Sequence, residues 1–379
     1  MSNISNDRKK TLTYISFEPL RQGHASYTHV IEIINGLKEQ EWVVNLIAPE
    51  YKSTHLPGII TRLFSFLKLW LRLLFSPKTD IIYTRMHFAG FIVSLIAKLK
   101  HIPIAVEVNG PFEDLYIAWP SVKKFRFIFD GLMRKQMQLA SVIISVTPGL
   151  EQYSEKKLSC YKKKPFFEVV TNGANTSIFM PKNQLPPKSN LFTKANEKPY
   201  AAFYGTFAKW QGLDNLLNAA TSPFWPPDLE LRLAGDGVMR PLVEEAAEKN
   251  KHIGYLGRIN YQDMPYFVSE SKLSFVLTQD TDGRGQFGLY PLKLFEAMAA
   301  GVPVITTRLP GQKDIVINND CGIVIPNSSP ETLCEAVTSI HKNQSRAKKY
   351  GWNGRQAAEE LYSWKQLAKR TDTILQKLL

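Results

Sequence analysis

A lysine and a glutamate three positions apart are the residues of this chain best placed to do chemistry. Lys293 and Glu296 fall in segment 291–300, whose apolar residues around a single carboxylate predict a helix. Residues three apart lie on one helical face. The lysine would bind a phosphate, and the glutamate would accept hydrogen bonds from ribose or hexose hydroxyls. The alternative is an ordinary ion pair that contributes on the order of a few tenths of a kcal/mol.

The sequence around this pair predicts one step of a parallel α/β layer. The helix ends at Gly301, and a β-branched run over 302–307 follows directly as a buried strand. Sheets of this kind bind ligands in the loops at the carboxyl ends of their strands. The loop before the helix is rich in glycine, including Gly288, and it carries Arg284 as a further cation for phosphate.

Another cation lies at a second junction between a strand and a helix. Segment 205–212 reads Gly-Thr-Phe-Ala-Lys-Trp-Gln-Gly, with Lys209 at its centre. A cation there suits a diphosphate, because the amino end of the next helix already favours negative charge. The alternative is a solvated lysine beside an aromatic residue that packs.

Three loops of the first half place polar residues after predicted strands. Loop 22–26 contains Gly23, which allows close approach of the backbone to an anionic or carbonyl oxygen at a helix start. Glu107 and Asn109 end one strand, and Asn172 follows another. The alternatives are plain, since most loops of this type contain a glycine and an Asn-Gly pair is itself a turn signal.

These residues need two parallel sheets to position them. Short apolar runs alternate with helical periodicity along both halves, which predicts strands covered by helices on both faces. The predicted strands are 12–17, 43–48, 81–84, 104–108, 142–145, 167–170, 200–204, 229–234, 253–256, 273–277 and 302–307, and the tail from residue 330 is mostly helical. Segment 182–198 lacks periodicity and is rich in Pro, Lys and Asn, so it is predicted to link two domains.

The length, charge and cysteine content of the chain limit the kinds of partner that it can bind and the place where it can work. The chain has 379 residues, which is long enough for two domains, and a net charge of +13. Residues 1–180 hold 23 Lys and Arg against 14 Asp and Glu, so the first half attracts anions. The sequence has no nucleic-acid-binding motif and no apolar run long enough to span a bilayer. Three cysteines without metal-ligand spacing and the lack of a signal peptide predict a cytoplasmic protein.

Segment 59–78 mixes Leu, Phe, Ile and Trp with four basic residues. This composition is too charged for a spanning helix and very apolar for a surface helix. It fits a helix that lies on an anionic membrane surface. A buried helix of the first domain that lines the acceptor site is an equally good explanation.

Taken together, these segments resemble the retaining GT-B glycosyltransferases of family 4, the glycosyltransferase 1 group, over nearly the whole chain. The resemblance rests on the order and spacing of several motifs rather than on one of them. They are the first loop and helix, 22–30, of a bacterial saccharide-assembly subgroup; Asn172-Gly173-Ala174-Asn175 with Phe179 and Pro181; Tyr204-Gly205 with Gly212-Leu213-Asp214; 233–237; 255–257; 291–303; and the closing 353–355 and 362–364.

The resemblance implies an α/β fold of the GT-B type, two Rossmann-like doubly wound domains that face a central cleft. The first, 1–182, would bind the acceptor, with helix 362–379 packed back on it; 183–198 would link it to a nucleotide-sugar domain, 199–361. No metal or other cofactor is implied, because protein cations and helix amino ends stabilise the leaving diphosphate. Lys209, Lys293 and Glu296 would be catalytic. The implied donor-binding residues are Gly23, Gly205, Thr206, Lys209, Arg284, Gly288, Leu289, Lys293 and Glu296, and the implied acceptor-side residues are His24, Glu107, Asn109 and Asn172.

The implied reaction moves a hexose from a UDP- or GDP-sugar to a saccharide, free or lipid-linked, in surface polysaccharide assembly. The implied location is the inner face of the cytoplasmic membrane, through 59–78. Four positions depart from the family pattern: Gly288 replaces a glutamate, Thr206 an arginine, Gln211 a lysine and Asn109 a histidine. Two alternatives therefore stay open, a nucleotide-sugar epimerase and a catalytically weak scaffold that binds nucleotide.

Overall fold

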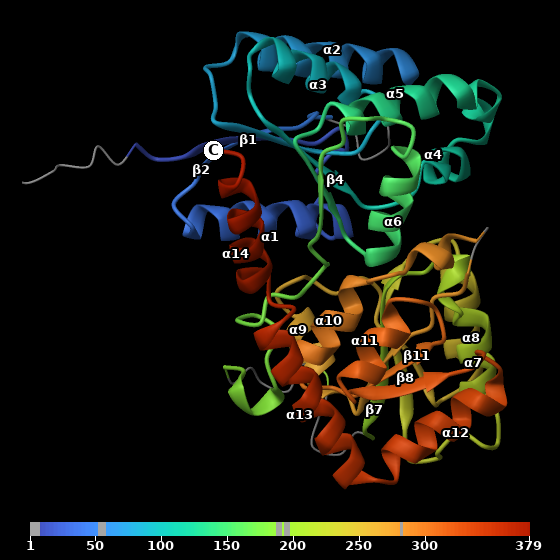
Figure 1. The fold of residues 1–379 in the computed structure, drawn as a ribbon. Helices are drawn as coiled ribbons and strands as arrows, with labels where there is room; N and C mark the ends of the chain where they lie inside the picture. Colours follow the sequence, from blue (N-terminus) through green and yellow to red (C-terminus); the bar gives the residue numbers. More distant parts are fainter. Residues whose placement is uncertain (1–7, 52–57, 187–191, 193–197, 281–282) are drawn as a thin grey trace, which may run out of the picture. The chain divides into compact units, whose positions relative to one another are not determined.

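The computed structural model describes residues 8–51, 58–186, 192, 198–280 and 283–379, and it divides the chain into two compact units (Figure 1). The first unit is Met1–Thr171 with Leu367–Leu379, and the second is Asn172–Gln366. Each unit contains one six-stranded sheet in which every pairing is parallel. The predicted fold class, α/β with two Rossmann-like domains, is confirmed.

The sheet of the first unit has the strand order β2-β1-β3-β4-β5-β6. Because β1 lies between β2 and β3, the chain switches direction across the sheet there, and ligand sites form at such points. The strands are β1 (Thr11–Ile15), β2 (Val43–Ile47), β3 (Ile81–Arg85), β4 (Ile104–Val108), β5 (Val142–Ser145) and β6 (Phe166–Val169). The helices are α1 (Ala25–Glu39), α2 (Ile59–Phe75), α3 (Gly90–Leu99), α4 (Glu113–Ala118), the 3-10 turn η1 (Pro120–Phe125), α5 (Arg126–Gln138), α6 (Pro148–Lys157) and, from the chain end, α14 (Trp364–Gln376).

The sheet of the second unit has the order β12-β11-β10-β7-β8-β9, with its own switch point at β7. The strands are β7 (Tyr200–Thr206), β8 (Glu230–Asp236), β9 (Ile253–Tyr255), β10 (Leu273–Val276), β11 (Val304–Thr307) and β12 (Gly322–Ile325). The helices are η2 (Lys182–Gln184), η3 (Lys209–Gln211), α7 (Leu213–Thr221), α8 (Arg240–Lys249), α9 (Met264–Glu270), η4 (Arg284–Phe287), α10 (Leu292–Ala299), α11 (Gln312–Asn318), α12 (Pro330–His341) and α13 (Gln344–Glu360).

Strand β7 shows how apolar runs build this core. Ala201 and Phe203 point into one cluster of buried residues, while Tyr200, Ala202 and Tyr204 point into another. Side chains alternate along a strand, so a continuous apolar run covers both faces of a parallel sheet. All five side chains are at most 3% exposed. The strand therefore holds its carboxyl end, from Gly205 on, in a fixed position.

The unit boundary differs from the predicted one. The sequence places it after residue 182, whereas the structure places it after Thr171. Ala174 forms a β-bridge with Ser363, and Phe179 is buried in the core of the second unit. This pairing joins residues about 190 positions apart in sequence, which no local pattern reveals. Most of the predicted linker, 183–198, lies outside the described residues.

Candidate functional site

Lys293 is a buried lysine at the start of α10. Its side chain is 9% exposed. The ammonium group donates a hydrogen bond to Oε1 of Gln211 at 2.8 Å and lies 4.4 Å from the centroid of the Phe203 ring. Burial lowers the pKa of Lys293 from its usual value to about 7, and the nearby Glu296 carboxylate opposes that change. A bound anion would restore the charged form, so this lysine is suited to hold a phosphate.

Glu296 lies one turn further along α10. Burial raises the pKa of Glu296 to about 7, against the opposing effects of the Lys293 ammonium and the Tyr204 hydroxyl. The same hydroxyl donates a hydrogen bond to the Lys293 carbonyl oxygen at 2.9 Å, which fixes the first turn of the helix to strand β7. Perturbed titratable groups of this kind concentrate at functional sites. The structure therefore brings the predicted pair together in one environment.

The carboxyl end of β7 forms the floor beside Lys293. Gly205 has φ +108°, and a Cβ added to it would lie 3.7 Å from Cε and Nζ of Lys293. Gly205 and Thr206 are exposed, and so is Lys209 in η3. The residue of η3 that reaches Lys293 is Gln211, which the sequence marked only as a departure from the family pattern. This contact spans 82 positions, so only the fold reveals it.

The loop before α10 keeps its amides occupied. Gly288 follows η4, and its N–H donates to the carbonyl of Gly285 at 3.0 Å. The Leu289 N–H donates to the carbonyl of Pro310, also at 3.0 Å. Oδ1 of Asp280 accepts from the Gly285 N–H at 2.7 Å and holds the loop from inside. In this conformation the predicted amide of Gly288 bonds within the loop, the predicted amide of Leu289 bonds to the segment after β11, and Arg284 begins η4 beside them.

Asn172 belongs to the second unit, whereas the predicted domain boundary places it in the first. Its Nδ2 donates to the carbonyl oxygen of Tyr290 at 2.8 Å, immediately before α10. The predicted acceptor-side position rested on a domain boundary after residue 182. Because the chain enters the second unit at 172, this asparagine positions the loop that precedes Lys293.

The first unit contains a buried polar cluster around Glu107. This carboxylate, on β4, is 1% exposed. Its Oε1 accepts from Asn109 at 2.5 Å and lies 2.9 Å from Nε2 of His29 and 3.4 Å from Nε of Arg85. Its Oε2 accepts from the Tyr83 hydroxyl at 2.6 Å. Arg85, His29 and Tyr83 were missed as partners, because they come from β3 and α1.

The charge of Glu107 is set by these partners. Burial alone would raise the pKa of Glu107, but His29, Arg85 and Tyr83 outweigh it and lower the pKa to about 2. Glu107 is therefore an ionised carboxylate that fixes its neighbours. Asn109, at the carboxyl end of β4, is held by it and lies at the edge of the sheet where ligands bind.

The loop after β1 exposes the remaining predicted residues. Gly23 has φ +86°, and a Cβ added to it would meet open space. His24 is exposed and precedes the first residue of α1, whose first-turn amides have no partner within the helix. An anion could approach the backbone here, as the sequence predicts for Gly23.

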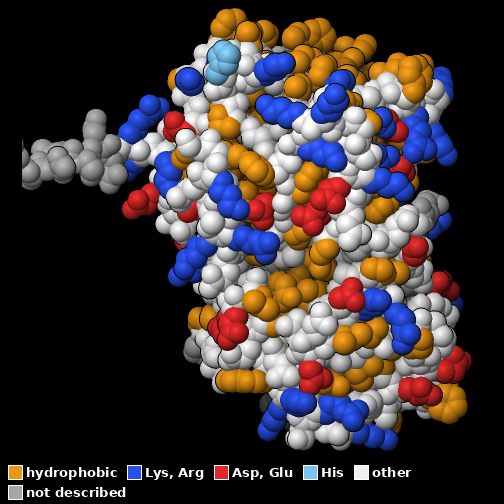
Figure 2. Space-filling model, in the orientation of Figure 1, with side chains coloured by type: hydrophobic (Ala, Val, Ile, Leu, Met, Phe, Trp, Pro, Cys, Tyr) orange, Lys and Arg blue, Asp and Glu red, His pale blue; other side chains and the backbone are white. Residues whose placement is uncertain are grey.

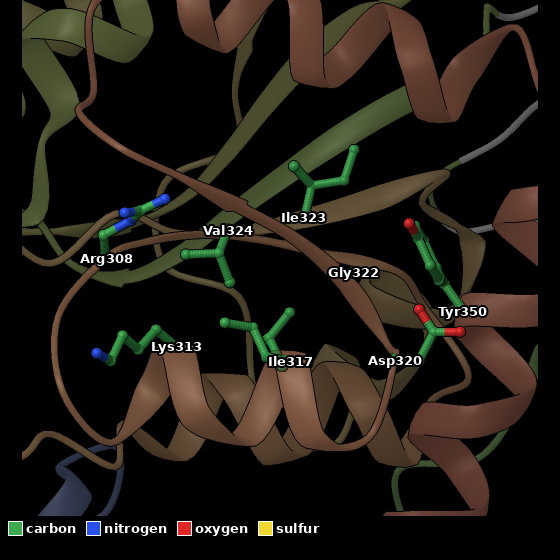
Figure 3. Close-up of a pocket in the computed structure, with 9 residues that line it drawn as sticks. Arg308, Lys313, Ile317, Asp320, Gly322, Ile323, Val324 and Tyr350 are labelled. Atoms are coloured by element: carbon green, nitrogen blue, oxygen red, sulfur yellow. The ribbon is translucent and has the colours of Figure 1, made fainter.

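A hollow of about 580 Å³ on the second unit lies away from these residues (Figure 3). It runs along the edge strand β12, with Arg308 and Lys313 at one end and Asp320 and Tyr350 at the other. Asp320 is already paired with Lys349 at 2.8 Å. None of the predicted site residues lines this hollow.

Neither a metal centre nor a membrane span is found in the part of the chain that the structure describes. Within it, no three His, Cys, Asp or Glu side chains gather as a ligand set. Within it, too, no helix is long and apolar enough to cross a bilayer.

Comparison with known proteins finds similarity to glycosyltransferases. Residues 188–357 match the family model described as glycosyl transferases group 1. The chain is 24% identical over 366 residues to an uncharacterised glycosyltransferase of Methanocaldococcus jannaschii, covering 92% of this chain and 93% of the relative. It is 26% identical over 253 residues to a GDP-mannose-dependent monoacylated alpha-(1-6)-phosphatidylinositol monomannoside mannosyltransferase of Corynebacterium glutamicum, covering 64% and 65%.

Solved structures extend the similarity to the whole fold. Sucrose-phosphate synthase from Thermosynechococcus elongatus superposes with a TM-score of 0.78 at 17% identity, covering 98% of this chain and 99% of that one. The Anabaena protein HepE in complex with UDP-glucose superposes with a TM-score of 0.70 at 14% identity, covering 97% and 99%. The fold is therefore GT-B, and the resemblance drawn from the sequence is confirmed.

Proposed function

Because residues 188–357 match the model of the group 1 glycosyl transferases and the chain has the GT-B fold, we propose that it transfers a hexose from a UDP- or GDP-sugar to a saccharide acceptor, with retention of the anomeric configuration. The observation that carries this proposal is the pair on α10, the buried Lys293 and the half-buried Glu296, beside the carboxyl end of β7. A nucleotide sugar offers the two groups that such a pair recognises, a diphosphate and vicinal hydroxyls.

The proposed chemistry is a displacement at the anomeric carbon of the donor. The bond from that carbon to the diphosphate oxygen breaks, an acceptor hydroxyl bonds to the carbon on the same face, and its proton leaves with the departing phosphate. Lys293, together with the exposed Lys209, stabilises the negative charge that develops on the leaving diphosphate. Neither a carboxylate nucleophile nor a metal ion is part of this proposal. Catalysis then rests on positioning and on charge stabilisation.

Relatives support the substrate class. One is named as a GDP-mannose-dependent mannosyltransferase, and solved neighbours of the same fold are titled as complexes with UDP and with UDP-glucose. The acceptor residues that we propose are His24, Glu107 and Asn109 of the first unit. Of these, Asn109 is the one that the buried Glu107 orients. A lipid-linked acceptor at the inner face of the cytoplasmic membrane completes the proposal.

A transfer assay tests it. The protein is incubated with a panel of UDP- and GDP-sugars, with and without saccharide acceptors, in the presence of a chelator, and products are identified by NMR. The expected result is one preferred donor, acceptor-dependent release of nucleotide, and a product with the anomeric configuration of the donor. Conversion of the donor sugar without acceptor would favour the epimerase instead. Nucleotide binding without any turnover would favour the scaffold.

A further inference from the structure

Helix α2 turns an apolar face to solvent. The exposed side chains Ile60, Leu63, Phe64, Leu67, Leu71 and Phe75 are 44–80% exposed. They recur at intervals of three and four residues, so they form one face of the helix. The opposite face carries Phe66, Leu69 and Leu73, each at most 3% exposed. The inner face of α2 is therefore part of the core, as expected for a buried helix. The outer face is exposed, as expected for a helix that lies on a membrane surface.

The charged residues of α2 are all positive. α2 carries Arg62, Lys68 and Arg72 and no acidic residue. Lys68 and Arg72 are exposed and four positions apart, so they form a basic row next to the apolar one. Large exposed apolar patches with a polar rim mark interaction sites on proteins. An anionic partner would satisfy both features together.

A second segment extends the same surface. The Arg62 guanidinium lies 4.6 Å from the centroid of the Trp119 ring, which ties α2 to the end of α4. From there, residues 117–128 expose apolar and basic side chains together and contain no acidic residue. Figure 2 shows hydrophobic side chains gathered over α2 and α3, with Lys and Arg beside them. The large exposed apolar residues of the segment are Ile117, Trp119, Phe125, Phe127 and Ile128. Its exposed basic residues are Lys123, Lys124 and Arg126, of which Arg126 pairs with Glu113 and Asp130.

We propose that the outer face of α2 and segment 117–128 together dock on the surface of an anionic lipid bilayer. We call them the α2 surface. Apolar side chains on a helix that lies flat enter the boundary between head groups and acyl chains, while Lys and Arg contact anionic head groups. A protein partner of matching chemistry would need an acidic rim around an apolar groove; a bilayer with anionic lipid offers both over any area.

The inner face of α2 packs on loops at the carboxyl edge of the first sheet and so connects the α2 surface to that edge. The Phe66 ring packs edge-to-face on Phe17 at 5.4 Å and on His87 at 5.5 Å. These two residues lie in the loops that follow β1 and β3, and next to them Glu18 pairs with Arg85 at 3.1 Å. Docking would therefore bring the lipid surface close to the edge that holds Asn109. This step rests on the proposed function: an acceptor that binds at this edge, next to a docked bilayer, is a saccharide carried on a lipid.

Vesicle sedimentation tests the docking. The full chain is mixed with vesicles of phosphatidylcholine alone or of equal phosphatidylcholine and phosphatidylglycerol. The expected result is binding to the anionic vesicles, at least tenfold weaker in Phe64→Ser/Leu67→Ser and in Lys68→Glu/Arg72→Glu. The control is Phe224→Ser, a residue of the second unit that is 72% exposed, which should bind as wild type. Equal binding to both vesicles, or equal binding by all variants, overturns the proposal.

Two further readouts separate the possible failures. Nucleotide affinity, measured by calorimetry, should be unchanged in the α2 variants, because they alter another unit. Analytical ultracentrifugation should show a monomer; a dimer that Phe64→Ser/Leu67→Ser dissociates would make the α2 surface a self-interface and overturn the proposal.

If the wild type binds anionic vesicles but transfers no sugar, the docking stands and the proposed function fails. If it transfers sugar but binds no vesicles, the proposed function stands and the docking fails.

Discussion

At the scale of single residues, the pair on α10 is held in an unusual electrostatic state. Burial moves the pKa of Lys293 down and that of Glu296 up, and both arrive at about 7. The site is therefore ready to become fully charged when a donor supplies the compensating phosphates and hydroxyls.

This state predicts a donor affinity that is greatest near pH 7. In the proposed complex, the donor favours the Lys293 ammonium and the Glu296 carboxylate. As the pH falls below about 7, Glu296 takes up a proton and loses the charge that strengthens the hydrogen bonds it accepts. As the pH rises above about 7, Lys293 loses its charge. Calorimetric titration with a nucleotide sugar between about pH 5.5 and 8.5 measures this dependence. Glu296→Gln should remove the acidic limb alone, and a flat wild-type profile would contradict the account.

At the scale of elements, the site depends on the close approach of β7 and β8. Gly205 and Gly235 are partners in this pairing. Gly235 has φ +153°, and a Cβ added to it would lie 1.9 Å from the Gly205 carbonyl oxygen. The backbone beside Lys293 thus depends on a glycine in the neighbouring strand.

We expect Gly235→Ala to destabilise the protein by at least about 2 kcal/mol, because the strained backbone and the clash with a carbonyl cannot both relax. Donor affinity should fall as well, since Gly205 must move. The matched control is Gly254→Ala in β9, where the new Cβ would make an ordinary 3.5 Å contact with Arg232. Urea unfolding compares the two, and equal midpoints for both variants would refute the role given to Gly235.

At the scale of the whole molecule, the chain crosses from the second unit back to the first. Residues Leu367–Leu379 belong to the first unit. Asp372 accepts from the Trp42 indole at 2.7 Å, and Lys377 pairs with Glu168 at 2.8 Å. Leu367, Ile374 and Leu375 are at most 4% exposed. The last helix is thus a structural part of the unit in which the chain begins.

Removing residues 367–379 should therefore loosen the first unit and spare the second. Each buried leucine or isoleucine contributes roughly 1.5–3 kcal/mol, so the loss amounts to several kcal/mol. Hydrogen exchange should speed up in β1–β6 while β7–β12 keep their protection. Unchanged exchange in the first unit would show that this helix does not stabilise it.

The sequence predicts local features of this molecule well and long-range contacts poorly. The strands follow from apolar runs, and the position of Lys293 and Glu296 on one face of a helix follows from their spacing. Gln211 beside Lys293, and His29 beside Glu107, depend on which strands become neighbours in the sheet. The same holds for Asn172, which lies in the second unit because the chain next to it, at Ala174, forms a β-bridge with Ser363. Such contacts become visible only with the topology.

The central claim is that Lys293 holds the diphosphate of a nucleotide sugar. The most direct test is calorimetric titration of the preferred nucleotide sugar at pH 7 into wild type, Lys293→Ala and the control Lys251→Ala, an exposed lysine of the same unit. The account predicts that Lys293→Ala weakens binding at least about tenfold, or 1.4 kcal/mol, and lowers turnover by a similar factor while the fold is kept. It also predicts that Lys251→Ala binds as wild type. Equal affinity in wild type and Lys293→Ala would contradict the account.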